Sequence, residues 1–271
     1  MKNLVSIVIP LYNTEISEYE NISLSQCLKI LKDFDIKFIS PNNLKNSNLY
    51  YEMKGFGEFV FFDDRFFNSV KTYNELMLSK VFYNQFLSYD YVLIYQLDAF
   101  VFNNDLIYWI EKKYSYIGAP WFKGFESSNE NNPFIGVGNG GFSLRNVKDC
   151  IKVLNSRKKI YSLLDFIKCT KKNNVKSLIK NLRAYFSLPS FKNCYNNDYS
   201  INEDYVFYLA SKRLNFFKVP KADIAFKFSF ELHPQKLYEM NNKKLPFGCH
   251  AWWKYDLKFY KNFINQRGYD L

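Results

Sequence analysis

The chain has 271 residues and a formal charge of +11; 48% of its residues are hydrophobic and 20% are aromatic. This composition excludes a disordered protein, and the length allows one large core or a core with an appendage. No apolar run approaches the roughly 18 residues that cross a membrane, and the first residues lead into a strand rather than a signal peptide. The five cysteines are scattered without a CxxC pair, which favours reduced thiols in a cytoplasm.

The positive charge is concentrated in one segment. Residues 157–183 hold nine basic side chains and one acid, with leucines and isoleucines between them. This pattern predicts one or two basic amphipathic helices, within an insertion at about 155–195. The segment is expected to be a solvated hairpin on the core, a surface that binds the anionic inner face of the cell membrane, or a lid over the substrate. No nucleic-acid-binding motif accompanies it, so we expect no nucleic-acid partner.

Strands and helices alternate in the first hundred residues. The pattern predicts strands at 5–10, 36–39, 59–62 and 91–95, and helices at 23–32 and 74–86. Such an alternation indicates an α/β fold with a mostly parallel central sheet.

The second half has a different character. Glycine and proline are frequent from 118 to 141 and predict loops, a helix is expected at 203–213, short strands at 216–219 and 225–230, and a further loop at 247–253. No segment is long enough to be a linker. We therefore expect a single domain over 1–271, with a nucleotide-binding half at about 1–105 and an acceptor-binding and catalytic half at about 106–271.

An acid follows the most apolar strand. The run Tyr91–Tyr95 predicts a strand buried on both faces, and Asp98 comes just after it. Ligands of open α/β sheets bind at the carboxyl ends of the strands, so Asp98 is a candidate functional acid. The alternative is that it caps a turn.

Two strings in this half resemble glycosyltransferases of the GT-A type. Val5-Ser6-Ile7-Val8-Ile9-Pro10-Leu11-Tyr12-Asn13 resembles their opening strand, and Gln96-Leu97-Asp98 stands where they carry Asp-x-Asp. The resemblance implies a nucleotide sugar contacted by the chain after the first strand, and Mn²⁺ or Mg²⁺ on the donor diphosphate. Because glutamine replaces the first acid, the motif is incomplete.

Three strings in the second half are similar to Fringe-like β-1,3-glycosyltransferases. The turn Asn139-Gly140-Gly141 resembles their acceptor-pocket segment, Glu203-Asp204 their general-base motif, and His250 their metal-binding histidine. The resemblance implies an inverting transfer with Asp204 as base and Glu203 as the fallback. Each string also has a simpler interpretation: a tight turn, a helix N-terminus with acids in its first turn, and a structural histidine.

From about 3 to 256, apart from 155–195, the chain resembles a microbial family of glycosyltransferase character described only as a domain of unknown function. We expect transfer of a sugar from a nucleotide-diphosphate sugar, with UDP favoured, to a glycan or lipid-linked glycan of the cell surface. A nucleotidyltransferase and a non-catalytic glycan- or membrane-binding module are the alternatives. The candidate residues are Asp204 and Glu203 for catalysis; Pro10, Tyr12, Asn13, Tyr73, Asn74, Gln96 and Asp98 for the donor; Asn139, Gly140, Gly141, Trp252 and Trp253 for the acceptor; and Asp98 and His250 for the metal.

Overall fold

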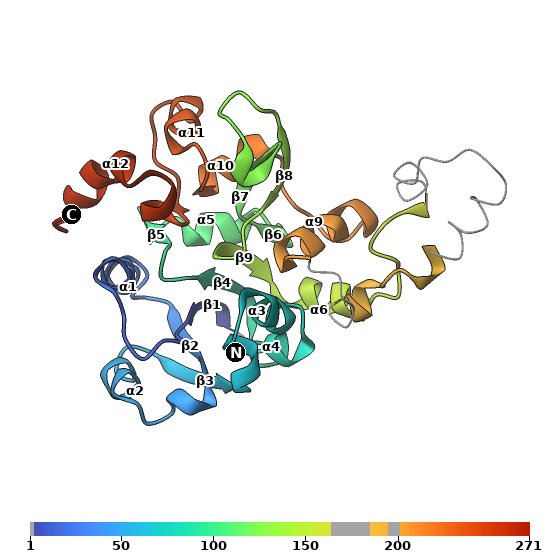
Figure 1. Cartoon of the computed structure of the whole chain (residues 1–271), viewed down its shortest axis with the longest axis horizontal. Helices are drawn as coiled ribbons and strands as arrows, with labels where there is room; N and C mark the ends of the chain where they lie inside the picture. Colours follow the sequence, from blue (N-terminus) through green and yellow to red (C-terminus); the bar gives the residue numbers. More distant parts are fainter. Residues whose placement is uncertain (1–2, 164–184, 195–200) are drawn as a thin grey trace.

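A computed structural model describes residues 3–163, 185–194 and 201–271. Its centre is a six-stranded sheet in the order β3-β2-β1-β4-β9-β6 (Figure 1). The strands are β1 Asn3–Pro10, β2 Asp35–Pro41, β3 Glu58–Phe62, β4 Tyr89–Tyr95, β6 Tyr116–Ile117 and β9 Phe142–Asn146. The first four run parallel, whereas β9 is antiparallel to both β4 and β6. This confirms the predicted α/β fold with a mostly parallel central sheet.

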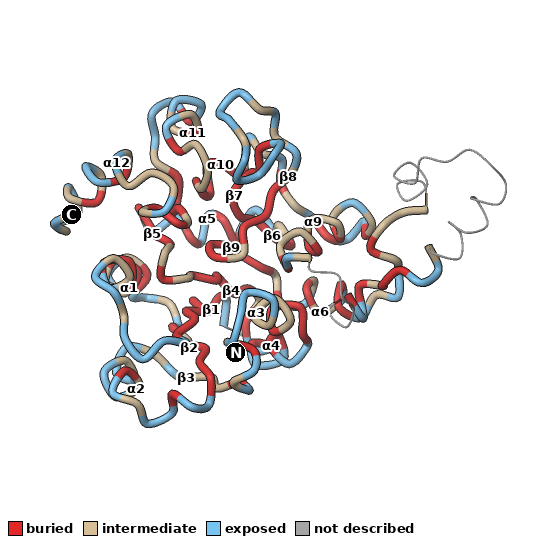
Figure 2. Tube along the Cα trace, viewed as in Figure 1, coloured by how far each residue is buried: buried red, intermediate tan, exposed pale blue. Residues whose placement is uncertain are grey.

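Helices cover both faces of this sheet, because successive side chains of a strand point to opposite sides. On β1, Val8 joins the core beneath α3, α4, α6 and α9, whereas Ile7 and Ile9 join the core beneath α1 and α5. Figure 2 shows the buried strands at the centre and the exposed outer surfaces of the helices. The helices are α1 Glu18–Ile30, α2 Asn48–Met53, α3 Val70–Met77, α4 Lys80–Asn84, α5 Leu106–Glu111, α6 Val147–Asn155 and α9 Glu203–Arg213.

The rest of the chain adds two small sheets and a third core. The strand pair is β7 Ala119–Phe122 with β8 Phe134–Gly138, and the three-stranded sheet joins β10 Ser229–Phe230, β11 Gly248–Cys249 and β5 Phe100–Val101. The remaining helices are α10 Ala222–Phe228, α11 Pro234–Met240 and α12 Trp252–Asn265, and short 3₁₀ turns lie at Asn42–Leu44 (η1), Asp64–Phe67 (η2), Phe125–Ser127 (η3) and Phe191–Asn193 (η4). In Figure 1 the two small sheets and the helices α10, α11 and α12 lie on the side of the molecule away from β1, β2 and β3.

Two predicted helices differ from the observed ones. The helix expected at 74–86 is two helices, because Ser79 Oγ accepts from Phe82 N at 3.2 Å and donates to Leu76 O at 2.7 Å. The first helix begins at Glu18 rather than near residue 23, since Ser17 and Glu20 form a capping box.

Four predictions for the second half are wrong in detail. The loop expected at 118–141 contains the antiparallel pair β7–β8, and 216–219 is not a strand. The strand expected at 225–230 is mostly the helix α10, and the loop at 247–253 contains β11 and the start of α12. Short, aromatic-rich stretches carry weak periodicity, so tertiary packing decides between helix and strand.

Most of the basic segment predicted at 157–183 lies outside the described residues. At its start, Lys159 Nζ donates to the carbonyls of Phe186, at 2.7 Å, and Leu188. Within the described residues no helix combines the length and the apolar character that a membrane span requires.

Candidate active site

A cleft of about 1220 Å³ lies at the carboxyl ends of β1 and β4. Its walls come from the segments that follow β1, β4 and β8 and from the N-terminal ends of α3, α9 and α12. A smaller pocket of about 140 Å³ adjoins it, and Tyr12, Gln96 and Asp98 line both cavities. The predicted donor, base, glycine and metal residues are therefore gathered in one region, with Pro10 and Asn13 in the smaller pocket and Tyr73 and Asn74 in the cleft.

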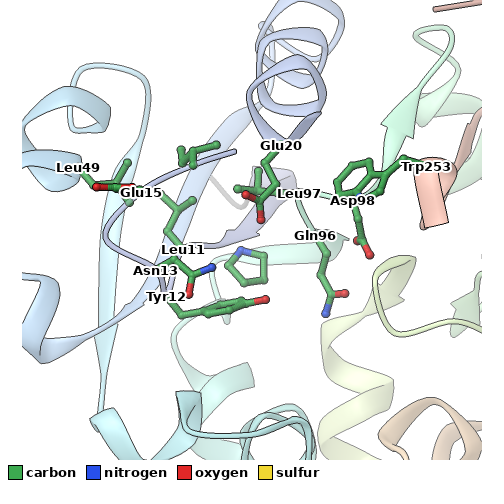
Figure 3. Close-up of a pocket in the computed structure, with 12 residues that line it drawn as sticks. Leu11, Tyr12, Asn13, Glu15, Glu20, Leu49, Gln96, Leu97, Asp98 and Trp253 are labelled. Atoms are coloured by element: carbon green, nitrogen blue, oxygen red, sulfur yellow. The ribbon is translucent and has the colours of Figure 1, made fainter. Parts of the chain in front are cut away.

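Figure 3 shows how residues that follow the strand ends line the smaller pocket. The side chains of Gln96 and Asp98 point to the same side of the chain, and the hydroxyl of Tyr12 is directed toward Gln96 (Figure 3). Gln96 N donates to Gly141 O at 2.8 Å, which ties the end of β4 to the turn before β9. The position of Asp98 is therefore fixed by the central sheet.

His250 lies directly against this strand end. Its Nε2 lies 3.0 Å from Asp98 Oδ1 and 3.3 Å from Gln96 Oε1, and its Nδ1 lies 2.9 Å from Glu231 Oε1. Burial lowers the pKa of His250, but the carboxylates of Asp98 and Glu231 outweigh burial and raise it to about 10. Burial raises the pKa of Asp98, but the charge of His250 and its hydrogen bond hold the value below the usual range.

The nitrogen and oxygen atoms around His250 Nε2 are suitable ligands for a divalent cation. Among the described residues, no three His, Cys, Asp or Glu side chains are grouped to hold a metal. Asp98 and His250 nevertheless converge with the amide oxygen of Gln96, and Glu231 holds the outer ring nitrogen of His250. A carboxylate behind a histidine is the usual support of a metal-binding imidazole. These residues therefore fit a cation with mixed oxygen and nitrogen ligands.

The glycine turn passes directly against this group. A Cβ at Gly141 would lie 2.0 Å from His250 Nε2 and 2.6 Å from Gln96 Oε1, and one at Gly140 would lie 2.5 Å from Glu203 Oε1. Glycine is required at both positions by this close approach. The buried Asn139 adopts φ 85°, and its Oδ1 accepts from the backbone N–H groups of Gly141 and Phe142, so its side chain holds the turn together.

Glu203 and Asp204 begin α9 but have different environments. Glu203 is buried, and its Oε1 lies 2.7 Å from Nη2 of Arg145, which is itself fully buried and also donates to Gly140 O at 3.1 Å. Asp204 Oδ2 accepts from Asn139 N at 2.9 Å, and its Oδ1 accepts from Tyr205 N at 2.7 Å. The Arg145–Glu203 ion pair therefore anchors the start of the helix, whereas no cationic side chain among the described residues pairs with Asp204.

Burial and the neighbouring charge of Glu203 raise the pKa of Asp204 to about 7. A carboxylate with this pKa can accept a proton near neutral pH. Asn202 occupies the N-cap position of α9, but its Oδ1 accepts from Asn74 Nδ2 at 3.2 Å instead of capping the helix. This bond ties α9 to α3.

One predicted acceptor residue is wrong. Trp252 is fully buried in the third core and donates its indole N–H to Ser23 Oγ at 2.9 Å, so its ring cannot wall a sugar. Trp253 is partly exposed and lines the smaller pocket beside Asp98, away from Asp204. Two aromatic neighbours in sequence point to different places because α12 begins at Trp252.

The sequence prediction missed several residues of this site. Glu231 follows β10 and gave no signal in the sequence, and Arg145, in β9, was given no predicted role. Trp121, Phe125 and Tyr205 line the cleft near Asp204, and only their aromatic character could have indicated them.

Several solved glycosyltransferases are similar in structure at low identity. Mouse xyloside xylosyltransferase 1 matches with a TM-score of 0.49 and 10% identity, over 90% of this chain and 96% of that one. The galactosyltransferase LgtC matches with 0.44 and 13%, over 90% and 86%. The glycosyltransferase GlyE of Streptococcus pneumoniae matches with 0.45 and 13%, over 97% and 63%. Because these TM-scores are below 0.5, the fold is assigned from the chain's own sheet, described above.

No curated protein matches the sequence. A family model does match, and it covers residues 57–250, which include the end of β4, the glycine turn, the start of α9 and His250. The chain belongs to the family described as "Protein of unknown function (DUF5672)".

Proposed function

We propose that the chain is an inverting glycosyltransferase that takes a sugar from a nucleotide-diphosphate donor, with UDP favoured. The observation that carries this proposal is the pairing, in one cleft, of the Asp98–His250 group with a separate carboxylate, Asp204, whose pKa is raised to about 7. The cleft of about 1220 Å³ exceeds the usual size of a small-molecule pocket and has room for both a nucleotide sugar and an acceptor.

Each side of the cleft has its own task in this proposal. Asp98, His250 and Gln96 would hold Mn²⁺ or Mg²⁺, which neutralises the charge that grows on the departing diphosphate. Glu231 orients His250, and Tyr12, in the smaller pocket, offers a flat ring to the donor's base. Tyr73 and Asn74 line the cleft as further donor residues.

Asp204 accepts the proton of the acceptor hydroxyl. The acceptor oxygen forms a bond to the anomeric carbon from the face opposite the diphosphate, while the bond from that carbon to the diphosphate oxygen breaks and its electron pair leaves with the diphosphate. Glu203, paired with Arg145, holds the helix that presents Asp204. The acceptor is proposed to be a glycan or lipid-linked glycan of the cell surface.

A donor-hydrolysis screen tests this function. The full chain is incubated with Mn²⁺ and each of a panel of nucleotide sugars, and released nucleoside diphosphate is measured. We expect release from at least one donor and loss of release with EDTA. Cleavage to a nucleoside monophosphate and a sugar phosphate instead would support a nucleotidyltransferase, and no release from any donor would support a non-catalytic module. With a transferred product, retention of the donor's anomeric configuration, seen by NMR, would exclude the inverting mechanism.

A further inference from the structure

Three aromatic side chains form a wall of the cleft that the chemistry above does not use. Trp121, Phe125 and Tyr205, here called the aromatic wall, all line the cleft. The ring centroid of Trp121 lies 5.6 Å from that of Phe125 and 6.0 Å from that of Tyr205. These separations are typical of rings in mutual contact. Trp121 is only 6% exposed, so Phe125 and Tyr205 present most of this surface and Trp121 supports them from behind.

Trp121 of this wall packs against two glycines of β8. Trp121 pairs with Gly136 across the β7–β8 ladder. A Cβ at Gly138 would lie 1.7 Å from Trp121 Cζ2, and one at Gly136 would lie 3.1 Å from Trp121 Cε3. The indole therefore lies flat across two glycines, and this packing accounts for the glycine-rich string before Asn139.

Phe125 lines the cleft in a strained backbone conformation. It has φ 50°, directly after Gly124 with φ 99°, and its side chain remains 44% exposed. A non-glycine residue in the left-handed region is strained; of the described non-glycine residues with positive φ, Phe125 and Asn139 line the cleft. The next residue fixes the turn, since Glu126 Oε1 accepts from Tyr255 OH at 2.9 Å and lies 3.7 Å from Lys254 Nζ.

The aromatic wall lies beside Asp204. Tyr205 follows Asp204 in the chain, and Asp204 accepts from Asn139 N, one residue after the Gly138 that supports Trp121. Asp204 and Glu126 are the acids adjacent in sequence to Tyr205 and Phe125, and Lys254, which also lines the cleft, is paired with Glu126. A ligand on the wall therefore meets apolar rings with carboxylates beside them.

We propose that the aromatic wall is the acceptor subsite and that it takes a neutral pyranoside. This inference rests on the proposed function, because Asp204 is the base that the bound hydroxyl would face. A pyranoside has an apolar face of C–H groups that can pack on aromatic rings, and its hydroxyls can donate to nearby carboxylates. An anionic sugar would bring its charge toward Asp204 and Glu126 and is disfavoured.

Saturation-transfer NMR on the full chain with UDP and Mg²⁺, which is diamagnetic, tests the subsite without turnover. The neutral probes are methyl β-glucoside, methyl β-galactoside and methyl N-acetyl-β-glucosaminide. Methyl β-glucuronide is the anionic probe for comparison. We expect signals from at least one neutral probe and weaker signals from the glucuronide. Phe125→Ala and Tyr205→Ala should each weaken binding of the neutral probe by roughly tenfold, which is about 1.4 kcal/mol. Phe56→Ala, which removes a ring that is 55% exposed and outside the cleft, should have no effect.

Three results would overturn the subsite. They are unchanged probe binding in both cleft variants, no signal from any neutral probe, and preferential binding of the glucuronide. Because Phe125 is exposed, its variant carries the test even if Tyr205→Ala does not fold. Failure of the proposed function is visible separately, since donor hydrolysis would then be absent in the unmodified chain while probe binding is still measured.

Discussion

The two sides of the cleft are built differently. On the donor side, Tyr12 and Asp98 follow the parallel strands β1 and β4, whose positions are set by the central sheet. On the base side, Asp204 depends on a turn, a helix N-terminus and the buried Arg145–Glu203 ion pair. The donor side is a direct product of strand order, whereas the base side needs contacts between segments far apart in the chain. Substitutions on the donor side should therefore lower turnover without changing the free energy of unfolding. Substitutions of residues that support Asp204 should also lower the free energy of unfolding.

The largest effect is expected at the end of β4. Asp98→Ala should abolish turnover with little loss of stability, because Asp98 lies beyond the strand and its proposed work is on the metal and diphosphate. Steady-state donor hydrolysis and urea unfolding measure the two quantities. Asp63→Ala is a matched control, since Asp63 follows the parallel strand β3 but is exposed and outside the cleft. Near-normal rates in Asp98→Ala would contradict the assignment.

The second largest effect is expected at the base. Asp204→Asn should lower kcat by roughly 10²- to 10⁴-fold, the usual cost of losing a general base, because the amide cannot take the acceptor proton. Nucleotide binding should remain close to that of the unmodified chain. If a Glu203→Gln variant loses more activity than Asp204→Asn without a loss of stability, the two acids have been assigned in the wrong order.

The ion pair beneath the base side should matter for folding. Arg145→Met leaves the buried Glu203 without its cation, and breaking a buried pair in this way costs about 3–5 kcal/mol of unfolding free energy. Urea unfolding measures this loss. Lys152→Met is the control, because Lys152 is paired with Asp149 at the surface and its removal should change stability by less than about 1 kcal/mol. Equal losses in the two variants would show that the interior pair does not support this side.

The smallest effect is expected in the dependence of kcat on pH. Burial and Glu203 raise the pKa of Asp204 to about 7, so the base is protonated and inactive below that pH. We expect kcat to fall about tenfold per pH unit below 7 and to level off above it. The folded chain holds this proton more tightly than the unfolded chain, so the contribution of Asp204 to stability is greatest at low pH and declines as pH rises through 7. The acid limb should be absent in Asp204→Asn; its persistence there would assign it to another group.

The difference between the sides also explains what the sequence could predict. The position of Asp98 at the end of β4 could be predicted because a strongly apolar strand precedes it, and strand ends of parallel sheets meet at one edge. Trp252 was misplaced because its neighbours do not show that α12 begins there and turns its ring into the core. Glu231 and Arg145 have no local signal, since their roles depend on partners 19 and 58 residues away. Long-range contacts of this kind are set by the assembled fold.

Isothermal titration calorimetry of UDP with Mn²⁺ tests the division of the cleft most directly. The full chain, Asp98→Ala and Asp204→Asn are titrated under the same conditions. The account predicts that UDP binds to the unmodified chain and to Asp204→Asn with similar affinity, and that Asp98→Ala loses the Mn²⁺-dependent part of binding. Equal UDP binding by all three proteins, with or without Mn²⁺, would contradict a donor site at the end of β4.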